Sequence, residues 1–220
     1  MEKKYEVIKS DEIIHNGITL FRIRALRDII GNVGEIIAEK GEFGGYIEKE
    51  ENLDQNCEAW IFDDAKVYGN AKICEKAKVC DNAEVYGDAK VYGNASIFDD
   101  AKIYGKAKVY GNASIFDDAK VYGDAEVYDD ANVSDFAKIY HKAKVHGNCS
   151  IFGHAEISGK VNITNQANVY GKAKVYGQAQ IFGCAQVYGN ARVLGTTKVY
   201  GEIRINFNQV LCNGDFFSWT

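Results

Sequence analysis

AKVYGN-ASIFDD-AKIYGK-AKVYGN-ASIFDD (residues 89–118) contains one six-residue pattern five times in succession. The register of this pattern is kept from residue 53 to residue 208. In the 23 hexads of residues 65–202, position one is Ala in 20, and position three is Val or Ile in all 23. A period this short is typical of a solenoid, because one unit cannot bury its own apolar face and must stack on its neighbours.

Each hexad predicts a short strand followed by a corner. Alternate side chains of an extended segment point to opposite sides, so positions one and three face inward while positions two and four face outward. Position five is mostly Gly, with Asp, Asn and Glu as substitutes, as expected of a corner with a positive φ angle. The two ASIFDD hexads, which begin at Ala95 and Ala113, are three hexads apart. This spacing predicts three hexads per coil and a three-sided rod of about nine coils.

The repeat divides the chain into three parts. Residues 1–52 are not repetitive and are predicted to form a small N-terminal cap, with strands near residues 5–8 and 18–24. Residues 53–208 form the hexapeptide-repeat rod, and residues 209–220 end in FFSWT, whose aromatic side chains suit a C-terminal cap. Caps are expected because the end of a solenoid exposes unpaired strand edges and an open apolar core.

Four N-terminal motifs carry a family resemblance. LFRIRALRDI (20–29), GEFGGYI (41–47), NL (52–53) and AWIF (59–62), followed by the hexads, together resemble the YdcK-like proteins of bacteria, phages and prophages. The resemblance covers the whole chain. It implies an all-β fold, a single-stranded left-handed parallel β-helix; the handedness comes from the family and not from the spacing. It supplies no catalytic residues.

Composition restricts the compartment and the partners. The net charge of −5 argues against direct nucleic-acid binding, although a local basic strip remains compatible with it. The chain has neither an apolar run long enough to cross a membrane nor a signal-peptide core, so a cytoplasmic location in a bacterial host cell is expected. Six cysteines at positions 57, 74, 80, 149, 184 and 212 follow no CxxC pattern; we interpret them as free thiols that replace small apolar residues.

Two enzyme classes are built on such rods. Acyltransferases that use acetyl-CoA have a loop leaving the helix and a His general base, but here the hexads run from 53 to 208 without an insertion. A zinc carbonic anhydrase would use His141 and His146 with a third His at position 105, which is Gly105. His154 lies on another coil. No cofactor, metal site or catalytic residue is therefore predicted.

Outward position four forms columns of aromatic side chains. The longest run comprises Tyr68, Tyr86, Tyr104, Tyr122 and Tyr140, followed by Ser158 and Tyr176. Rings one coil apart can stack in an offset arrangement, which stabilises the rod by about 0.5–1.5 kcal/mol per pair. The alternative interpretation is that exposed aromatic surface marks a protein interface.

One corner of the rod is acidic as well as aromatic. Where most corners use Gly, this one repeats Asp at positions five and six, next to a Phe column at position four. We predict that it docks a partner through Phe62, Asp63, Asp64, Asp81, Phe98, Asp99, Asp100, Phe116, Asp117, Asp118 and Asp135. Drift by repeat duplication and cation binding are the alternatives. A row of carboxylates at fixed pitch could imitate a nucleic-acid backbone toward a basic protein.

These observations predict a non-enzymatic binding protein of phage or prophage type. Its partner is expected to be a protein with a basic surface, in the most specific form a host nucleic-acid-binding defence protein that the chain inhibits. An acetyl-CoA-dependent acyltransferase is the first alternative, and a self-assembling structural rod is the second. A homo-oligomer is compatible with all three.

Overall fold

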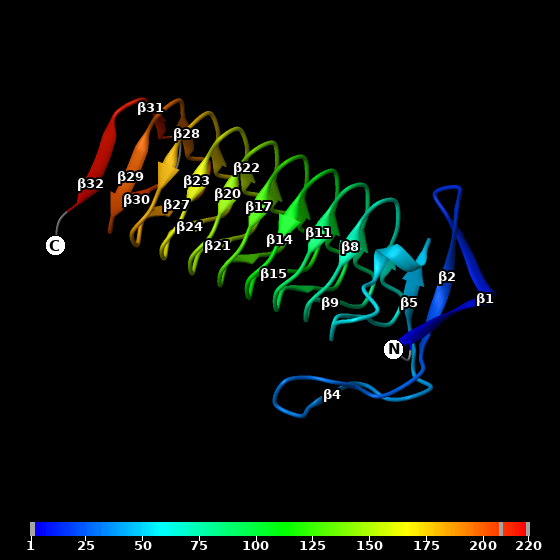
Figure 1. Ribbon diagram of the computed structural model, residues 1–220. Helices are drawn as coiled ribbons and strands as arrows, with labels where there is room; N and C mark the ends of the chain where they lie inside the picture. The colour runs from blue at the N-terminus through cyan, green and yellow to red at the C-terminus, as the bar shows by residue number, and fades with distance from the viewer. Residues whose placement is uncertain (1–2, 207–208, 219–220) are drawn as a thin grey trace.

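The computed structural model describes residues 3–206 and 209–218 and shows an all-β rod of about ten coils (Figure 1). Within these residues the helical content is one 3-10 turn, η1 (Glu50–Asn52). Each coil contributes one short strand to each of three long parallel ladders, which we name faces A, B and C. The parallel β-solenoid expected from the hexads is confirmed.

Over the described part of the chain, face A belongs to a twelve-stranded sheet that begins with an antiparallel hairpin. Its strands, in spatial order, are β1 (Tyr5–His15), β2 (Ile18–Ala25), β5 (Phe43–Ile47), β7 (Lys66–Val67), β10 (Glu84–Val85), β13 (Lys102–Ile103), β16 (Lys120–Val121), β19 (Lys138–Ile139), β22 (Glu156–Ile157), β25 (Lys174–Val175), β28 (Arg192–Leu194) and β31 (Val210–Cys212).

Within the described residues, faces B and C each have nine strands. Face B consists of β8 (Lys72–Ile73), β11 (Lys90–Val91), β14 (Lys108–Val109), β17 (Glu126–Val127), β20 (Lys144–Val145), β23 (Asn162–Ile163), β26 (Gln180–Ile181), β29 (Lys198–Gly201) and β32 (Asp215–Ser218). Face C consists of β6 (Trp60–Ile61), β9 (Lys78–Val79), β12 (Ser96–Ile97), β15 (Ser114–Ile115), β18 (Asn132–Val133), β21 (Ser150–Ile151), β24 (Asn168–Val169), β27 (Gln186–Val187) and β30 (Arg204–Ile205). A separate ribbon pairs β3 (Ile29–Ile30) with β4 (Ile36–Ala38).

The register along each face advances by three hexads from one strand to the next. Glu84 pairs with Lys66 on one side and with Lys102 on the other. Positions one and three point inward, and residues such as Ala107 and Val109 are fully buried. Because the core is made of one small and one β-branched side chain per strand, it is narrow and closely filled.

The corners need a left-handed backbone. Gly105 has a φ angle of +72°, and a Cβ atom there would lie 2.9 Å from the backbone N of Gly123 in the next coil. The coils therefore approach so closely at this corner that Gly fits both the angle and the space.

The ladders extend beyond the hexads at both ends. β5 pairs in parallel with β7, so part of the N-terminal region already belongs to face A. At the other end, Leu211 of β31 pairs with Val193, and Phe216 of β32 pairs with Val199. Both segments lack the hexad, which explains why the rod has about ten coils where the repeat predicts about nine.

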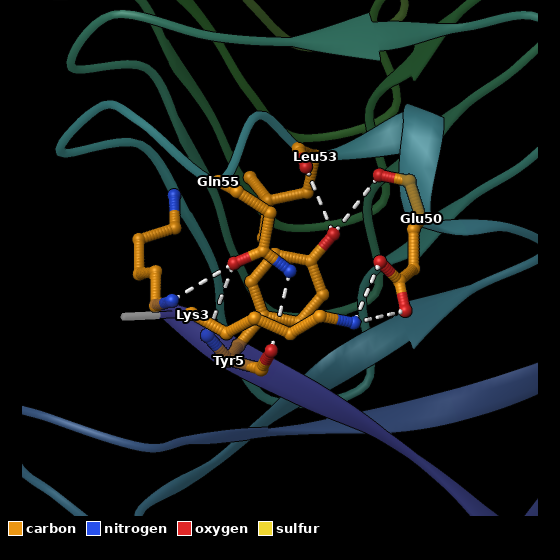
Figure 2. Close-up of polar contacts among 6 residues, drawn as sticks. Lys3, Tyr5, Glu50, Leu53 and Gln55 are labelled. Atoms are coloured by element: carbon orange, nitrogen blue, oxygen red, sulfur yellow. Dashed lines mark hydrogen bonds and ion pairs between the residues drawn. The ribbon is translucent and has the colours of Figure 1, made fainter. Parts of the chain in front are cut away.

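Side chains close the N-terminal end (Figure 2). In the ladder, a position-one carbonyl accepts a backbone N–H from the preceding coil, as Ala77 O does from Trp60 N at 3.1 Å. On face A, Tyr46 of β5 supplies this donor to Ala65, but among the described residues no preceding strand supplies it to Leu53 or Ala59. The Tyr5 hydroxyl donates instead to the carbonyl of Leu53 at 2.8 Å and to that of Glu50 at 3.0 Å.

Lys4 has the same role deeper in this end. Its side chain is fully buried, and its Nζ donates to the carbonyls of Asp54, Cys57 (3.1 Å) and Ala59 (2.9 Å). Burial lowers the pKa of the Lys4 ammonium below its usual value. A buried cation is tolerated because three backbone acceptors surround it, and two of them, the carbonyls of Cys57 and Ala59, would otherwise lack donors.

Candidate docking edge

The eleven predicted residues lie along the corner where each face C strand turns toward the next face A strand; we name this line the acidic edge. Ser96 of β12 pairs with Ser114 of β15, so equivalent residues of the two ASIFDD hexads lie in adjacent coils. The structure therefore brings Asp99 and Asp100 next to Asp117 and Asp118 at the same corner.

The aspartates at position five are part of the corner itself. All five have left-handed backbone angles, with φ between +50° and +60°: Asp63, Asp81, Asp99, Asp117 and Asp135. Each carboxylate also accepts a backbone N–H from the equivalent residue one coil later. For example, Asp99 Oδ2 accepts from Asp117 N at 3.3 Å, and Asp117 Oδ2 accepts from Asp135 N at 3.1 Å. These bonds hold the carboxylates in a fixed row.

The aspartates at position six are freer. Asp100 and Asp118 are exposed, and neither carboxylate makes a side-chain bond within residues 3–206 and 209–218. Asp64 differs, because Arg22 of β2 lies 3.3 Å from its Oδ1. The N-terminal hairpin thus covers the acidic edge at Asp64 and leaves it open at Asp100 and Asp118.

The phenylalanines of the edge are half-buried rather than prominent. Phe98 and Phe116 stack with ring centroids 5.0 Å apart and planes within 1° of parallel. Phe62 packs against the main core. Because stacked rings show mainly their edges to solvent, the aromatic area available to a partner is smaller than the sequence suggests.

The same corner changes character toward the C-terminus. Phe136 takes the place of an aspartate at position six, is 51% exposed, and stacks on His154 at 4.8 Å between ring centroids. Together with Asp118, Lys120 and other neighbours, these two rings line a depression of about 360 Å³. Phe136 was not among the predicted site residues, although an aromatic at a corner position departs from the hexad.

The three histidines considered for zinc occupy separate places. His141 is a corner residue with φ of +60°, and His146 stacks on Tyr128 at 4.6 Å. His146 Nε2 is 3.1 Å from Asn162 Oδ1, and its Nδ1 is 3.2 Å from Thr164 Oγ1. Over the described part of the chain, no group of three His, Cys, Asp or Glu side chains is arranged to hold a metal ion, and the six cysteines are free thiols.

A second polar cluster, which sequence reasoning missed, fastens the N-terminal hairpin to face A. Glu84 Oε2 lies 3.0 Å from both His15 Nε2 and the Tyr68 hydroxyl, and Glu84 Oε1 accepts from Lys102 Nζ at 2.7 Å. Burial alone would raise the pKa of Glu84, but these hydrogen bonds outweigh it and hold that pKa below the usual value. The partners lie 69, 16 and 18 residues away along the chain, so no local motif reveals them.

The outward columns of faces A and B stack as expected. From Tyr68 to Tyr140 the face A rings follow one another at centroid distances of 4.7–5.0 Å. Beside them, the lysine columns are interrupted by carboxylates, and Lys108 and Lys144 both pair with Glu126. Faces A and B are therefore of mixed charge.

Comparison with known proteins concerns the repeat. Residues 185–201 match the family model described as YdcK Beta solenoid repeat. This match and the parallel β-solenoid together fit a YdcK-like repeat family. No curated protein matches the chain. Among the described residues there is no helix of sufficient length and hydrophobicity to span a membrane.

Proposed function

We propose that this β-solenoid is a non-enzymatic binding protein that docks a basic protein surface on the acidic edge. The observation that supports this most directly is the fixed geometry of the position-five carboxylates. The Asp99 and Asp117 side chains are held by backbone N–H groups, so they need little further ordering when a partner binds. Exposed Asp100 and Asp118 stand beside them and add charge that a basic partner would meet first.

The spacing of the aspartates along the acidic edge indicates which kind of partner would fit it. Eight aspartates over five coils, each rising about 4.8 Å, amount to roughly one charge per 3 Å. One DNA strand carries one charge per about 3.4 Å along the helix axis. A protein that binds a phosphate backbone would therefore find charges at a similar pitch. In its most specific form, the proposal is a phage or prophage protein that occupies such a site on a host defence protein.

A pair of charge-matched variants tests the edge. Asp100→Lys with Asp118→Lys reverses the charge of the two exposed position-six residues and keeps the position-five aspartates that bond the backbone. Asp124→Lys with Glu202→Lys makes the same charge change at position six on other corners, where both residues are exposed. The immobilised proteins are used to capture partners from a bacterial lysate, and a captured protein is then purified and its Kd measured by calorimetry at two salt concentrations.

The proposal expects one partner with a basic surface that binds more weakly at higher salt. The edge variant should bind it at least about tenfold more weakly, whereas the control variant should keep its affinity. Equal affinities of the two variants for that partner, with unchanged melting curves, would refute docking at the acidic edge.

A further inference from the structure

The aromatic column on face A has a gap of one coil. Its rings stack without interruption as far as Tyr140, the next position is Ser158, and Tyr176 follows one coil later. Stacked neighbours in this column are 4.7–5.0 Å apart. Two coils therefore separate Tyr140 from Tyr176 by roughly 10 Å, since each strand rises about 4.8 Å. One planar ring between them would restore the spacing that the column uses elsewhere.

The gap is a real depression of the surface. It has a volume of about 370 Å³ and is lined by Tyr140, Ser158 and Tyr176, together with Glu156, Lys174 and Arg192. Volumes of this size lie at the lower end of the range found for small-molecule sites. Both tyrosines are half-buried, so their positions are fixed by the rod and need no rearrangement to receive a ring.

A basic depression adjoins the gap. It measures about 450 Å³ and is lined by Lys172, Lys174, Asn190, Arg192 and Val210, so the two depressions share Lys174 and Arg192. Glu156 lies 3.1 Å from Lys174 Nζ and offsets that charge. Lys172 and Arg192 have no carboxylate partner among the described residues. In a chain of net charge −5, two uncompensated cations beside an aromatic gap favour an anionic ligand.

We propose that this place binds a nucleotide, with the base between Tyr140 and Tyr176 and the phosphate on Lys172 and Arg192. A nucleobase has two flat faces, and each of the bases can stack on aromatic side chains. The Arg guanidinium and Lys ammonium are the groups that bind phosphate best. A sugar phosphate lacks the flat ring, and an uncharged aromatic lacks the anion. The nucleotide is the ligand class that uses both depressions.

The site is independent of the acidic edge, since it shares none of the eleven edge residues. The test therefore uses purified protein and four probes, AMP, GMP, CMP and UMP, with adenosine and ribose 5-phosphate as the separated halves of AMP. Binding is measured by calorimetry and by quenching of tyrosine fluorescence at probe concentrations up to about 1 mM.

Three variants locate the site. Ser158→Tyr fills the gap with a ring of the protein's own and should weaken nucleotide binding at least about tenfold, equivalent to about 1.4 kcal/mol. Ser134→Phe fills the corresponding gap in the face C column, between Phe116 and Phe152, and should leave binding unchanged. Lys172→Gln with Arg192→Gln should lower the affinity for AMP to that for adenosine.

Binding of at least one nucleotide, tighter than that of either half of AMP, weakened in Ser158→Tyr and kept in Ser134→Phe, would support the site. Failure of all four nucleotides to bind would overturn it. So would unchanged binding to the folded Ser158→Tyr protein, or equal binding of ribose 5-phosphate and AMP, because neither result needs the gap.

Discussion

Lys4 Nζ donates to the carbonyl oxygen of Ala59 at 2.9 Å, in the place where a preceding coil would have supplied a backbone N–H. The two residues are 55 positions apart, and both are fully buried. At the end of a solenoid the hydrogen-bond ladder stops. The carbonyls of the terminal coil that point out of the ladder then need other donors. Here one ammonium is the donor to two of them, the carbonyls of Cys57 and Ala59, and also bonds the carbonyl of Asp54. The end of the rod is therefore closed by hydrogen bonding as well as by apolar packing.

Replacing this ammonium tests how much the closure contributes. Lys4→Met keeps a long side chain in place but leaves the carbonyls of Cys57 and Ala59 without a donor, and each buried unsatisfied acceptor costs about 1–3 kcal/mol. We expect the free energy of unfolding in urea to fall by at least about 2 kcal/mol. Lys3→Met is the matched control, because Lys3 forms an exposed pair with Glu50 and its loss should change stability by less than about 0.5 kcal/mol. Equal effects of the two substitutions would contradict the assigned role.

The corner glycines allow two causes of strain to be separated. Gly105 and Gly17 both have left-handed angles, φ +72° and +78°, but a Cβ at Gly105 would lie 2.9 Å from Gly123 N, whereas a Cβ at Gly17 would meet nothing within 4 Å. Gly17→Ala should therefore cost about 1–2 kcal/mol from the backbone angle alone. Gly105→Ala should cost clearly more, since the next coil must move as well. Thermal unfolding of the two variants compares them, and a Gly105 variant as stable as the Gly17 variant would show that the coils yield freely.

Filling the gap in the tyrosine column should stabilise the rod. In Ser158→Tyr the new ring can stack on Tyr140 and Tyr176, and each stacked pair contributes about 0.5–1.5 kcal/mol. We expect a higher Tm, measured by circular dichroism. Ser158→Leu is the comparison, because it adds apolar volume without a ring and should raise the Tm less. A lower Tm for the Tyr variant would mean that the gap cannot accept a ring, and this would also weaken the case for a bound base.

Alkaline pH should unfold the rod through its phenols. Burial raises the pKa of Tyr110 and Tyr122 to about 12, from an ordinary value of 10.0. Each folded phenol holds its proton more tightly than the unfolded one. Its stabilising contribution is therefore complete below pH 10 and is lost as the pH rises through 12.

The Tm should consequently fall between pH 10 and 12 while tyrosinate absorbance rises. Tyr110→Phe with Tyr122→Phe removes two of these ionisations and should reduce the fall, because Phe keeps the stacking surface and has no proton to lose. If the double variant lost stability over this range as steeply as the natural chain, the phenols would not be responsible.

The sequence by itself determined the repeating part of the molecule. The order of residues in each hexad determines which side chains face inward, and the spacing of the two ASIFDD hexads predicted the pairing of Ser96 with Ser114. The stacking of Phe98 on Phe116 followed from the same spacing. Such features can be read from the sequence because the pairing partners are the same few residue types at one fixed separation, repeated in every coil.

Only the tertiary structure decided what breaks the repeat. Lys4 finds its carbonyls in a distant part of the chain, and Glu84 joins His15 of the hairpin to the rod, at separations that follow no period. The sequence predicts that the corner aspartates present their charges to a partner, whereas the structure shows Asp99 and Asp117 bonded to backbone N–H groups of the next coil.

The gap at Ser158 likewise became a candidate site only when coiling placed it beside Arg192 of β28, which lies two strands beyond β22 on face A. A hexad specifies the inside or outside of a coil. The contacts made by long polar side chains depend instead on which residues the coils bring together in space, and this is why the sequence alone did not reveal them.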